Sequence, residues 1–556
     1  MLALAAVLRL WALDRPDSLV FDELYYVRDA ISQLAHGFTT SWPDDDPAFT
    51  NSGSFSDRPN SIAHPPLGKW LIGLGILLFS PDSGWGWRIA AALAGIATVG
   101  LTMRLGWLMS RSMWIACLAG LLLAVDGVNV VLSRVSLLDI FLTLLVLLGA
   151  LFVWRDQASP PPRLRNSGVG RIAWRRPWLL AAGLAFGAAA AVKWSGLYAL
   201  AGFLVLITLR DWWLRRRARV RHPLAGAGLQ ALVTAGVALP AAFAAYLASW
   251  AGWIASPGAQ ERSPGEAWWV SLIRWHGDAL SWHTGLSAPH PYQAHPLSWP
   301  LALRPTAMYE VSWGPDEGCR WASGCVAVIS PLPNPLVTWG GVLALVLLLW
   351  AMLWTVLRAG RMAALRGRWI AAARAGRSAP VGSLDVPGSR LAASPLAAPA
   401  LWAAAFVLTG YLSGWLPWVL TFSRSAVFQF YAVVLTPFAA LALALVLGAV
   451  AGLPPTPAPH CAVRRGTRIA LPQRPAERFA SLSARQDARA ASRPSVLELA
   501  GIRLDPSPDS VRGRRMAVAI FAIAVLVLGV LFFPAWSGMP TAEWFWRLHV
   551  WLPGWD

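Results

Sequence analysis

The sequence predicts an all-α membrane protein that crosses the bilayer many times, built as a bundle of about eleven helices. Of its 556 residues 56% are hydrophobic and only 13% are charged, and its mean hydropathy is +0.49. Apolar runs near the length of a bilayer crossing recur throughout the chain. Because unpaired backbone groups are prohibitive in lipid, and because these runs are too long for barrel strands, the spans are expected to be helices.

The apolar runs place the predicted spans at 1–13, 86–109, 112–126, 136–154, 178–192, 195–209, 226–250, 336–357, 400–416, 427–452 and 516–535. The first is short against the roughly 20 residues that a crossing needs, so whether Met1 is the true start stays open. A cleaved signal peptide is the alternative for this segment, but a basic start and a small-residue cleavage site are missing. The run 66–74 opens with Pro and is too short to span, which favours a helix lying in the membrane interface within the first outer loop.

The formal charge of +19 is spread over the connections between spans, which argues against nucleic acid as a partner. Residues 155–177 and 210–222 each hold six Arg and one Asp, and 358–400 hold seven Arg and one Asp. By contrast, 14–65 hold nine acidic and three basic residues, and 252–335 hold six and four. The positive-inside rule therefore predicts that the Arg-rich connections and the N-terminus are cytoplasmic, and that the two acidic loops and the C-terminal tail lie outside a bacterial plasma membrane.

These assignments divide the chain into a catalytic core and two Arg-rich cytoplasmic segments. The core comprises 1–357 with the outer loops 14–65 and 252–335, two further spans within 400–452, and the last span with its outer tail within 515–556. The connection 358–400 and the insert 453–514 are biased toward Arg, Ala and Pro, and the insert is predicted to be disordered. Neither segment is assigned any chemistry.

Two of the four cysteines, Cys319 and Cys325, lie close together in the second outer loop. A disulfide is favoured there because the compartment permits oxidation, while two free thiols or a metal pair remain open.

Lysine is rare in this chain: only Lys69 and Lys193 occur among 47 basic residues. A compact ammonium suits a phosphate or an interface in a way that guanidinium does not, so a functional role is favoured over chance retention. Lys69 lies at the start of the interfacial helix, and Lys193 lies between two spans on the outer side.

The predicted topology gathers ionisable residues at the outer face, although they are scattered in sequence: Asp22, Glu23, His64, Lys69, Asp126, Arg134, Asp139, Lys193 and Arg424. Such groups are costly at membrane depth and are usually retained for a partner, a substrate path or a reaction. An anionic lipid headgroup needs cations, and an alcohol nucleophile needs a carboxylate base near the reacting carbon. The set provides both.

Structural roles stay open for several of these residues. Asp22 and Glu23 could be solvated loop acids or lie at the start of a helix, where acids favour the dipole. Asp139 and Arg134 could form a structural pair, His64 could shape a turn, and Asp126 could cap a connection. The tryptophans of the second outer loop are interpreted as membrane-interface anchors: Trp268, Trp269, Trp275, Trp282 and Trp299.

Sequence blocks in a fixed order carry a resemblance to a known family: FDELYY at 21–26, HPPLGKW at 64–70, SRVSLLD at 133–139, VKWSGL at 192–197, HPYQ at 290–293 with Trp299 and Pro300, and RSAVFQFY at 424–431. Together they resemble the protein O-mannosyltransferases, family GT39 of the GT-C superfamily, over nearly the whole chain except the two Arg-rich segments. The form is similar to the actinobacterial branch, because the outer loop 252–335 has no room for the large soluble domain of eukaryotic members.

The resemblance implies transfer of mannose from a polyprenyl-phosphate carrier to Ser or Thr of exported proteins, with inversion at the sugar carbon. Asp22 is then the expected base, while Glu23 would orient the acceptor or contact a cation. The donor and its phosphate would be bound by residues of the quoted blocks: Arg134, Lys193, Arg424, Lys69, His64, Asp139, Tyr25, Tyr26, Gln429, Tyr431 and His290. No cofactor or metal is obligatory, because phosphate is already a good leaving group; dependence on a divalent cation stays open.

Two other functions are weighed against this one. A GT-C enzyme could use the same class of donor with a lipid or polysaccharide acceptor. A transporter or flippase for the lipid-linked sugar should instead show related halves with charges near the midplane, and the chain shows neither. Partners expected from the favoured function are the lipid donor, secreted or membrane protein acceptors, membrane lipid and the protein-export machinery.

Overall fold

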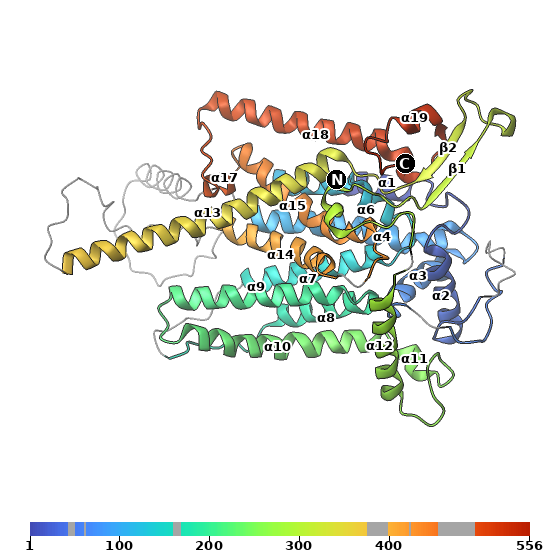
Figure 1. Cartoon of the computed structure of the whole chain (residues 1–556), viewed down its shortest axis with the longest axis horizontal. Coiled ribbons are helices and arrows are strands. Elements are labelled where there is room, and N and C mark those ends of the chain that lie inside the picture. Colours follow the sequence, from blue (N-terminus) through green and yellow to red (C-terminus); the bar gives the residue numbers. More distant parts are fainter. Residues whose placement is uncertain are drawn as a thin grey trace, which may run out of the picture.

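The computed structural model describes residues 1–42, 51–60, 63–158, 168–287, 289–374, 399–421, 424–453 and 495–556, with side chains except at 362–374. Within this part of the chain most residues are helical, and the long helices run side by side along one axis of the molecule (Figure 1). The prediction of a mostly helical protein is therefore confirmed.

Seven described helical segments are long and apolar enough to cross a membrane: α4 (Gly84–Ser110), α9 (Gly196–Arg217), α10 (Pro223–Ala248), the Pro335–Arg361 part of α13, α14 (Pro399–Val419), Gln429–Val450 and α18 (Pro508–Ser537). Three shorter apolar helices accompany them: α3 (Leu67–Phe79), α5 (Met113–Ala124) and α8 (Pro177–Val192). The bundle is completed by α1 (Leu2–Leu10), α6 (Gly127–Leu132) and α7 (Asp139–Ala158). Apart from α6, these helices coincide with the eleven apolar runs and with the short run at 66–74.

Three helices lie across one end of the bundle rather than along it: α2 (Glu23–His36), α11 (Ala251–Ala255) and α12 (Trp268–Gly285) (Figure 1). We call this the site end, because α2 begins directly after Asp22 and α12 carries His283. The sequence did not predict α12, since its many tryptophans were interpreted only as interface anchors. Trp275 and Trp299 are instead buried within the protein, while Trp269 and Trp282 are exposed.

A small antiparallel sheet also lies at the site end, so the expectation of an all-α chain was wrong in this region. Strand β1 (Tyr309–Trp313) pairs with β2 (Cys325–Ile329), which pairs with β3 (Thr541–Ala542). The buried run CVAVI has the β-branched composition that favours strands. Two short helices accompany the sheet, η2 (Pro315–Glu317) between β1 and β2 in the chain and α19 (Glu543–Arg547) after β3, while η1 (Pro296–Leu301) packs on α13, α14 and η4. The structure joins Cys319 and Cys325 in a disulfide.

Several predicted boundaries move. Helix α13 (Pro335–Arg374) extends well into the predicted cytoplasmic connection, and α18 begins at Pro508 rather than 516. The span at 427–452 begins as a 3-10 helix, η4 (Gln429–Leu435), before α15 (Thr436–Val450). Part of the predicted disordered insert is ordered, because α17 (Val496–Leu499) packs on α13 and α15. Residues 375–398 and 454–494, with Cys461, lie outside the described residues.

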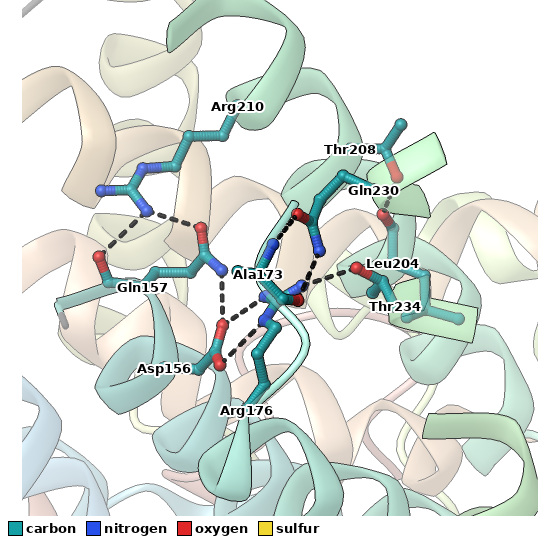
Figure 2. Close-up of polar contacts among 9 residues, drawn as sticks. All are labelled: Asp156, Gln157, Ala173, Arg176, Leu204, Thr208, Arg210, Gln230 and Thr234. Atoms are coloured by element: carbon teal, nitrogen blue, oxygen red, sulfur yellow. Dashed lines mark hydrogen bonds and ion pairs between the residues drawn. The ribbon is translucent and has the colours of Figure 1, made fainter. Parts of the chain in front are cut away.

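The opposite end of the bundle is held together by a network of polar side chains and backbone groups (Figure 2). Arg176 forms an ion pair with Asp156 at the end of α7 and donates to Thr234 of α10 at 2.6 Å. Arg210 of α9 donates to the Gln157 side chain at 2.5 Å. Gln230 bonds both backbone groups of Ala173. We call this the Arg-rich end; the part of α7 from Asp139 to Asp156 separates it from the site end by about 25 Å.

Candidate active site

Asp22 lies at the turn that starts α2 and is half-buried. It is the N-cap position of the helix, and the hydroxyl of Tyr26, one turn later, donates to Asp22 Oδ2 at 3.4 Å. Burial raises the pKa of the Asp22 carboxyl to about 6, although the positive charge of Lys193 acts in the opposite direction. A carboxylate with such a pKa is largely ionised at neutral pH and can accept a proton there.

Glu23, directly after Asp22, is in a different environment because its side chain is completely buried. Arg88 of α4 donates to both of its oxygens, at 2.9 and 2.8 Å. The backbone N–H groups of Val20 and Ser136 donate to them as well, at 2.9 and 2.8 Å. All four contacts come from the protein itself, so the expected role of Glu23 in contacting the acceptor or a cation does not fit this geometry. Glu23 instead ties the start of α2 to α4 and to the segment before α7.

Lys193 lies at the C-cap of α8 and is 7% exposed. Its ammonium forms an ion pair with Asp139, the first residue of α7, at 2.7 Å. The same nitrogen lies 4.6 Å from the centroid of the Tyr431 ring, a cation–π contact. Asp139 therefore pairs with Lys193. The pair of Asp139 with Arg134, which the sequence had left open, is not formed.

Arg424 precedes η4 and reaches the same place from the other side. Its Nε donates to the carbonyl of Ala426 at 3.0 Å, and its Nη2 donates to the Tyr431 hydroxyl at 3.4 Å. Its Nη1 lies 2.9 Å from Nδ1 of His283. The two cations, Lys193 and Arg424, thus flank one tyrosine ring.

Lys193, Arg424 and their partners line a cavity of about 150 Å³ between α7, α9, α12, α14 and η4, whereas Asp22 and Glu23 are not among its lining residues. Its polar part includes His64, Asp139, Lys193, His283, Arg424 and Tyr431. Its apolar part lies between the bundle helices and includes Leu142 and Val146 of α7, Ala199 of α9 and Val434. A cavity with cations at one side and aliphatic side chains at the other is suited to a phosphate attached to a hydrocarbon chain.

His64 and Lys69 occupy different places although they share one sequence block. His64 lines the cavity, and its ring stacks on the His283 ring with centroids 5.3 Å apart. Lys69 does not line it: its ammonium donates to the His64 carbonyl at 2.9 Å and forms an ion pair with Asp29 of α2 at 3.4 Å. Lys69 therefore links α3 to α2 and to the segment that holds His64.

The structure places Arg134 outside the cavity, as a cap on α1. Its guanidinium donates to four carbonyls at the end of that helix, those of Leu8, Arg9, Trp11 and Ala12, at 2.8–3.3 Å. The last carbonyls of a helix have no partners within it, and here one side chain satisfies them. The expected contact of Arg134 with the donor phosphate does not fit this geometry.

Other predicted residues also lie apart from the cavity. Asp126 caps α6 through the N–H of Asn129 at 2.8 Å, and with Gln429 it lines a separate small cavity. Tyr25 is 67% exposed. His290 lines an open depression of about 1110 Å³ at the surface and contacts the ring of Phe21, next to Asp22.

The sequence interpretation missed several lining residues, chiefly His283 of α12 with Trp194, Tyr198 and Trp418. The spacing of His276 and His283, seven residues apart, places both on one face of a helix, and this signal was available. Trp194 stood inside a quoted block without being assigned a role. The contact of α12 with residues 63–64 depends on long-range packing that no local pattern reveals.

The chain is similar to known proteins in sequence and in fold. Residues 1–254 match the family model described as "Dolichyl-phosphate-mannose-protein mannosyltransferase". The chain is 28% identical to a polyprenol-phosphate-mannose–protein mannosyltransferase of Mycobacterium tuberculosis, covering 96% of this chain and 86% of that protein. It is also 28% identical to the protein of the same description from Mycolicibacterium smegmatis, covering 100% and 91%.

A solved structure, the Saccharomyces cerevisiae protein O-mannosyltransferase Pmt1–Pmt2 complex bound to the sugar donor, is similar in fold. The TM-score is 0.63 at 14% identity, covering 100% of this chain and 91% of that chain. At this identity the likeness concerns the fold alone.

Proposed function

Because the chain belongs to the dolichyl-phosphate-mannose-protein mannosyltransferase family, we propose that it transfers mannose from polyprenol-phosphate-mannose to Ser or Thr hydroxyls of proteins, with Asp22 as general base. The observation that carries the assignment of the site is the position of Asp22. It lies within electrostatic reach of a cation-lined cavity whose far side is apolar.

The proposed reaction uses these positions. The acceptor hydroxyl oxygen attacks the anomeric carbon of mannose while its proton passes to the Asp22 carboxylate. The bond from that carbon to the phosphate oxygen breaks, and its electron pair stays on the leaving phosphate. Lys193 and Arg424 stabilise the charge that develops there, since fixed cations in a partly dry site act where charge appears. Attack opposite the leaving group inverts the configuration, giving an α-linked product from a β-linked donor.

Four further predicted residues support this centre. Tyr26 holds the Asp22 carboxylate by its hydroxyl, Asp139 and Tyr431 position the Lys193 ammonium, and His64 faces the cavity beside them. The apolar side of the cavity between α7, α9 and α14 accommodates the first isoprene units of the carrier. The reaction needs no obligatory metal, because the phosphate leaving group is stabilised by side chains.

The function is tested by transfer of radiolabelled mannose from synthetic polyprenyl-phosphate-mannose to a Thr- and Pro-rich peptide by membranes containing the protein. Transfer to the peptide and not to lipid or polysaccharide acceptors is expected, and it should persist with a chelator. Transfer to a lipid or polysaccharide acceptor alone would favour the other GT-C function. A folded acceptor should react more slowly than an unfolded one, because its hydroxyl must reach Asp22; equal rates would contradict coupling to protein export.

The pH dependence of transfer should show the titration of Asp22. The base acts in its ionised form, so the rate is expected to be at its full value above about pH 7 and to fall about tenfold per unit below pH 6. The measurement is kcat over pH 5–8 at saturating donor and peptide. A rate that is constant down to pH 5 would contradict a base with this pKa.

We further propose that eleven helices cross the membrane, with α2, α3 and α12 at its outer surface and the Arg-rich end in the cytoplasm. The support is the charge distribution, since Arg171, Arg176 and Arg210 meet at the end opposite Asp22. In a variant lacking free thiols, a membrane-impermeant maleimide should label Asp57→Cys but not Arg221→Cys on spheroplasts. Both should react after lysis, and the reverse pattern would invert the topology.

A further inference from the structure

His283 connects three parts of the cavity that are far apart in sequence. Its Nε2 lies 2.6 Å from the carbonyl oxygen of Ala63, and its Nδ1 lies 2.9 Å from the guanidinium of Arg424. Its ring stacks on that of His64 at 5.3 Å, with the planes 23° apart. A single imidazole thus contacts the segment before α3, the cation before η4 and the neighbouring histidine.

The chemistry of the two partners determines the protonation of the ring. A carbonyl oxygen can only accept a hydrogen bond, and a guanidinium can only donate one. Nε2 must therefore carry the proton that it donates to Ala63, and Nδ1 must be the free lone pair that accepts from Arg424. The ring is therefore a neutral imidazole in one tautomer. Burial, together with the charges of Arg424 and Lys193, lowers the pKa of His283.

We infer that His283 is a positioning residue for the donor phosphate: it orients the Arg424 guanidinium and supports the His64 ring against the cavity. This inference rests on the proposed function, in which Arg424 stabilises the phosphate. An arginine has a long and flexible side chain, and fixing it before the donor arrives removes part of the entropy cost of binding. With Nε bound to Ala426 and Nη1 to His283, the guanidinium plane is fixed, and unused N–H groups remain for the ligand.

His283 also links the cavity to a helix at the protein surface. Helix α12 lies across the ends of the bundle helices (Figure 1), and it exposes Trp269, Ile273 and Leu280. Leu280 lines the cavity as well, together with Thr284. The position of α12 therefore determines both a wall of the cavity and the orientation of its arginine.

The test is steady-state kinetics of the full chain in membranes with synthetic polyprenyl-phosphate-mannose. In His283→Ala, we expect KM for the donor to rise about 10- to 100-fold, the range for losing a hydrogen bond to a charged group, with a much smaller change in kcat. His283→Gln has an amide oxygen that can accept from Arg424 and an amide N–H that can donate to Ala63, so it should recover most of the donor affinity.

A matched control is His549→Ala. His549 is also buried, and its ring nitrogens lie 2.8 and 2.7 Å from the carbonyls of Phe545 and Leu531, outside the cavity. Its loss should lower thermal stability without changing KM for the donor. If both alanine variants lowered abundance equally and left KM for the donor unchanged, the role of His283 would be structural. This result would overturn the inference.

A double-mutant cycle keeps the inference testable even if His283→Ala folds poorly. If His283 acts through Arg424, then His283→Leu, which cannot accept a hydrogen bond from the guanidinium, should add little to the rise in donor KM that Arg424→Gln causes alone. Additive effects would show independent roles and overturn the inference. Failure of the wild-type protein to transfer mannose would refute the proposed function. That result is distinct from failure of the inference, which is measured by comparing His283 variants with an active wild type.

Discussion

Replacement of Asp22 by Asn is expected to abolish mannose transfer while leaving the protein folded and abundant. Loss of a general base typically costs 10²- to 10⁴-fold in rate, and Asn has the same shape without the basic oxygen. The Tyr26 hydroxyl can still donate to the amide oxygen, so little stability should be lost. The rate of peptide mannosylation and the thermal midpoint in detergent check both parts.

The matched control for this variant is Asp17→Asn in the same loop, because Asp17 is exposed and no side-chain bond to it is present among the described residues. Its activity should equal that of the wild type. If Asp22→Asn retained full activity at equal abundance, Asp22 would not be the base, and the carboxylate of Asp139 in the cavity would be the next candidate.

Replacement of the neighbouring residue, Glu23→Gln, is expected to give the opposite result, a large loss of stability. Glu23 and Arg88 are both fully buried, and breaking such a pair from one side costs about 3–5 kcal/mol, because it leaves an uncompensated charge inside the protein. The thermal midpoint and the yield of folded protein should fall far more than in Asp22→Asn, which makes the same chemical change one residue earlier.

A companion variant separates the two possible meanings of this result. In Glu23→Gln with Arg88→Met, the unpaired charge is removed, so part of the lost stability should return. A Glu23→Gln protein that is as stable as the wild type but inactive would contradict the structural role and restore the catalytic role that the sequence suggested for Glu23.

The apolar helices of the bundle could be predicted because each of them is encoded locally. A run of apolar residues must form a helix in lipid, and the eleven runs coincide with the helices α1, α4, α5, α7 to α10, α13, α14, α15 and α18. The extension of α13 and the sheet at β1 to β3 were missed, because an Arg-rich helix and short strands do not stand out by hydropathy.

The candidate site was only partly predictable, for a related reason. The sequence blocks identified which residues are unusual, including Asp22, Lys193 and Arg424, but they did not reveal the partner of each charge. Glu23 and Arg134 belong to the same set of sequence blocks as these residues. In the structure, however, Glu23 forms an ion pair with Arg88, and Arg134 donates its hydrogen bonds to carbonyls at the end of α1. The sequence around His283 hardly indicated its role, since the role of a histidine depends on the groups that its ring contacts in the folded protein.

By itself, therefore, the sequence determined the helical class, the charge asymmetry between the two ends and the group of residues from which the site is drawn. The tertiary structure alone decided which of them share one cavity. The physical reason is that hydropathy and helix formation depend on neighbours in the chain. The environment of a buried charge depends instead on groups brought together from distant segments, as Ala63, His283 and Arg424 are here.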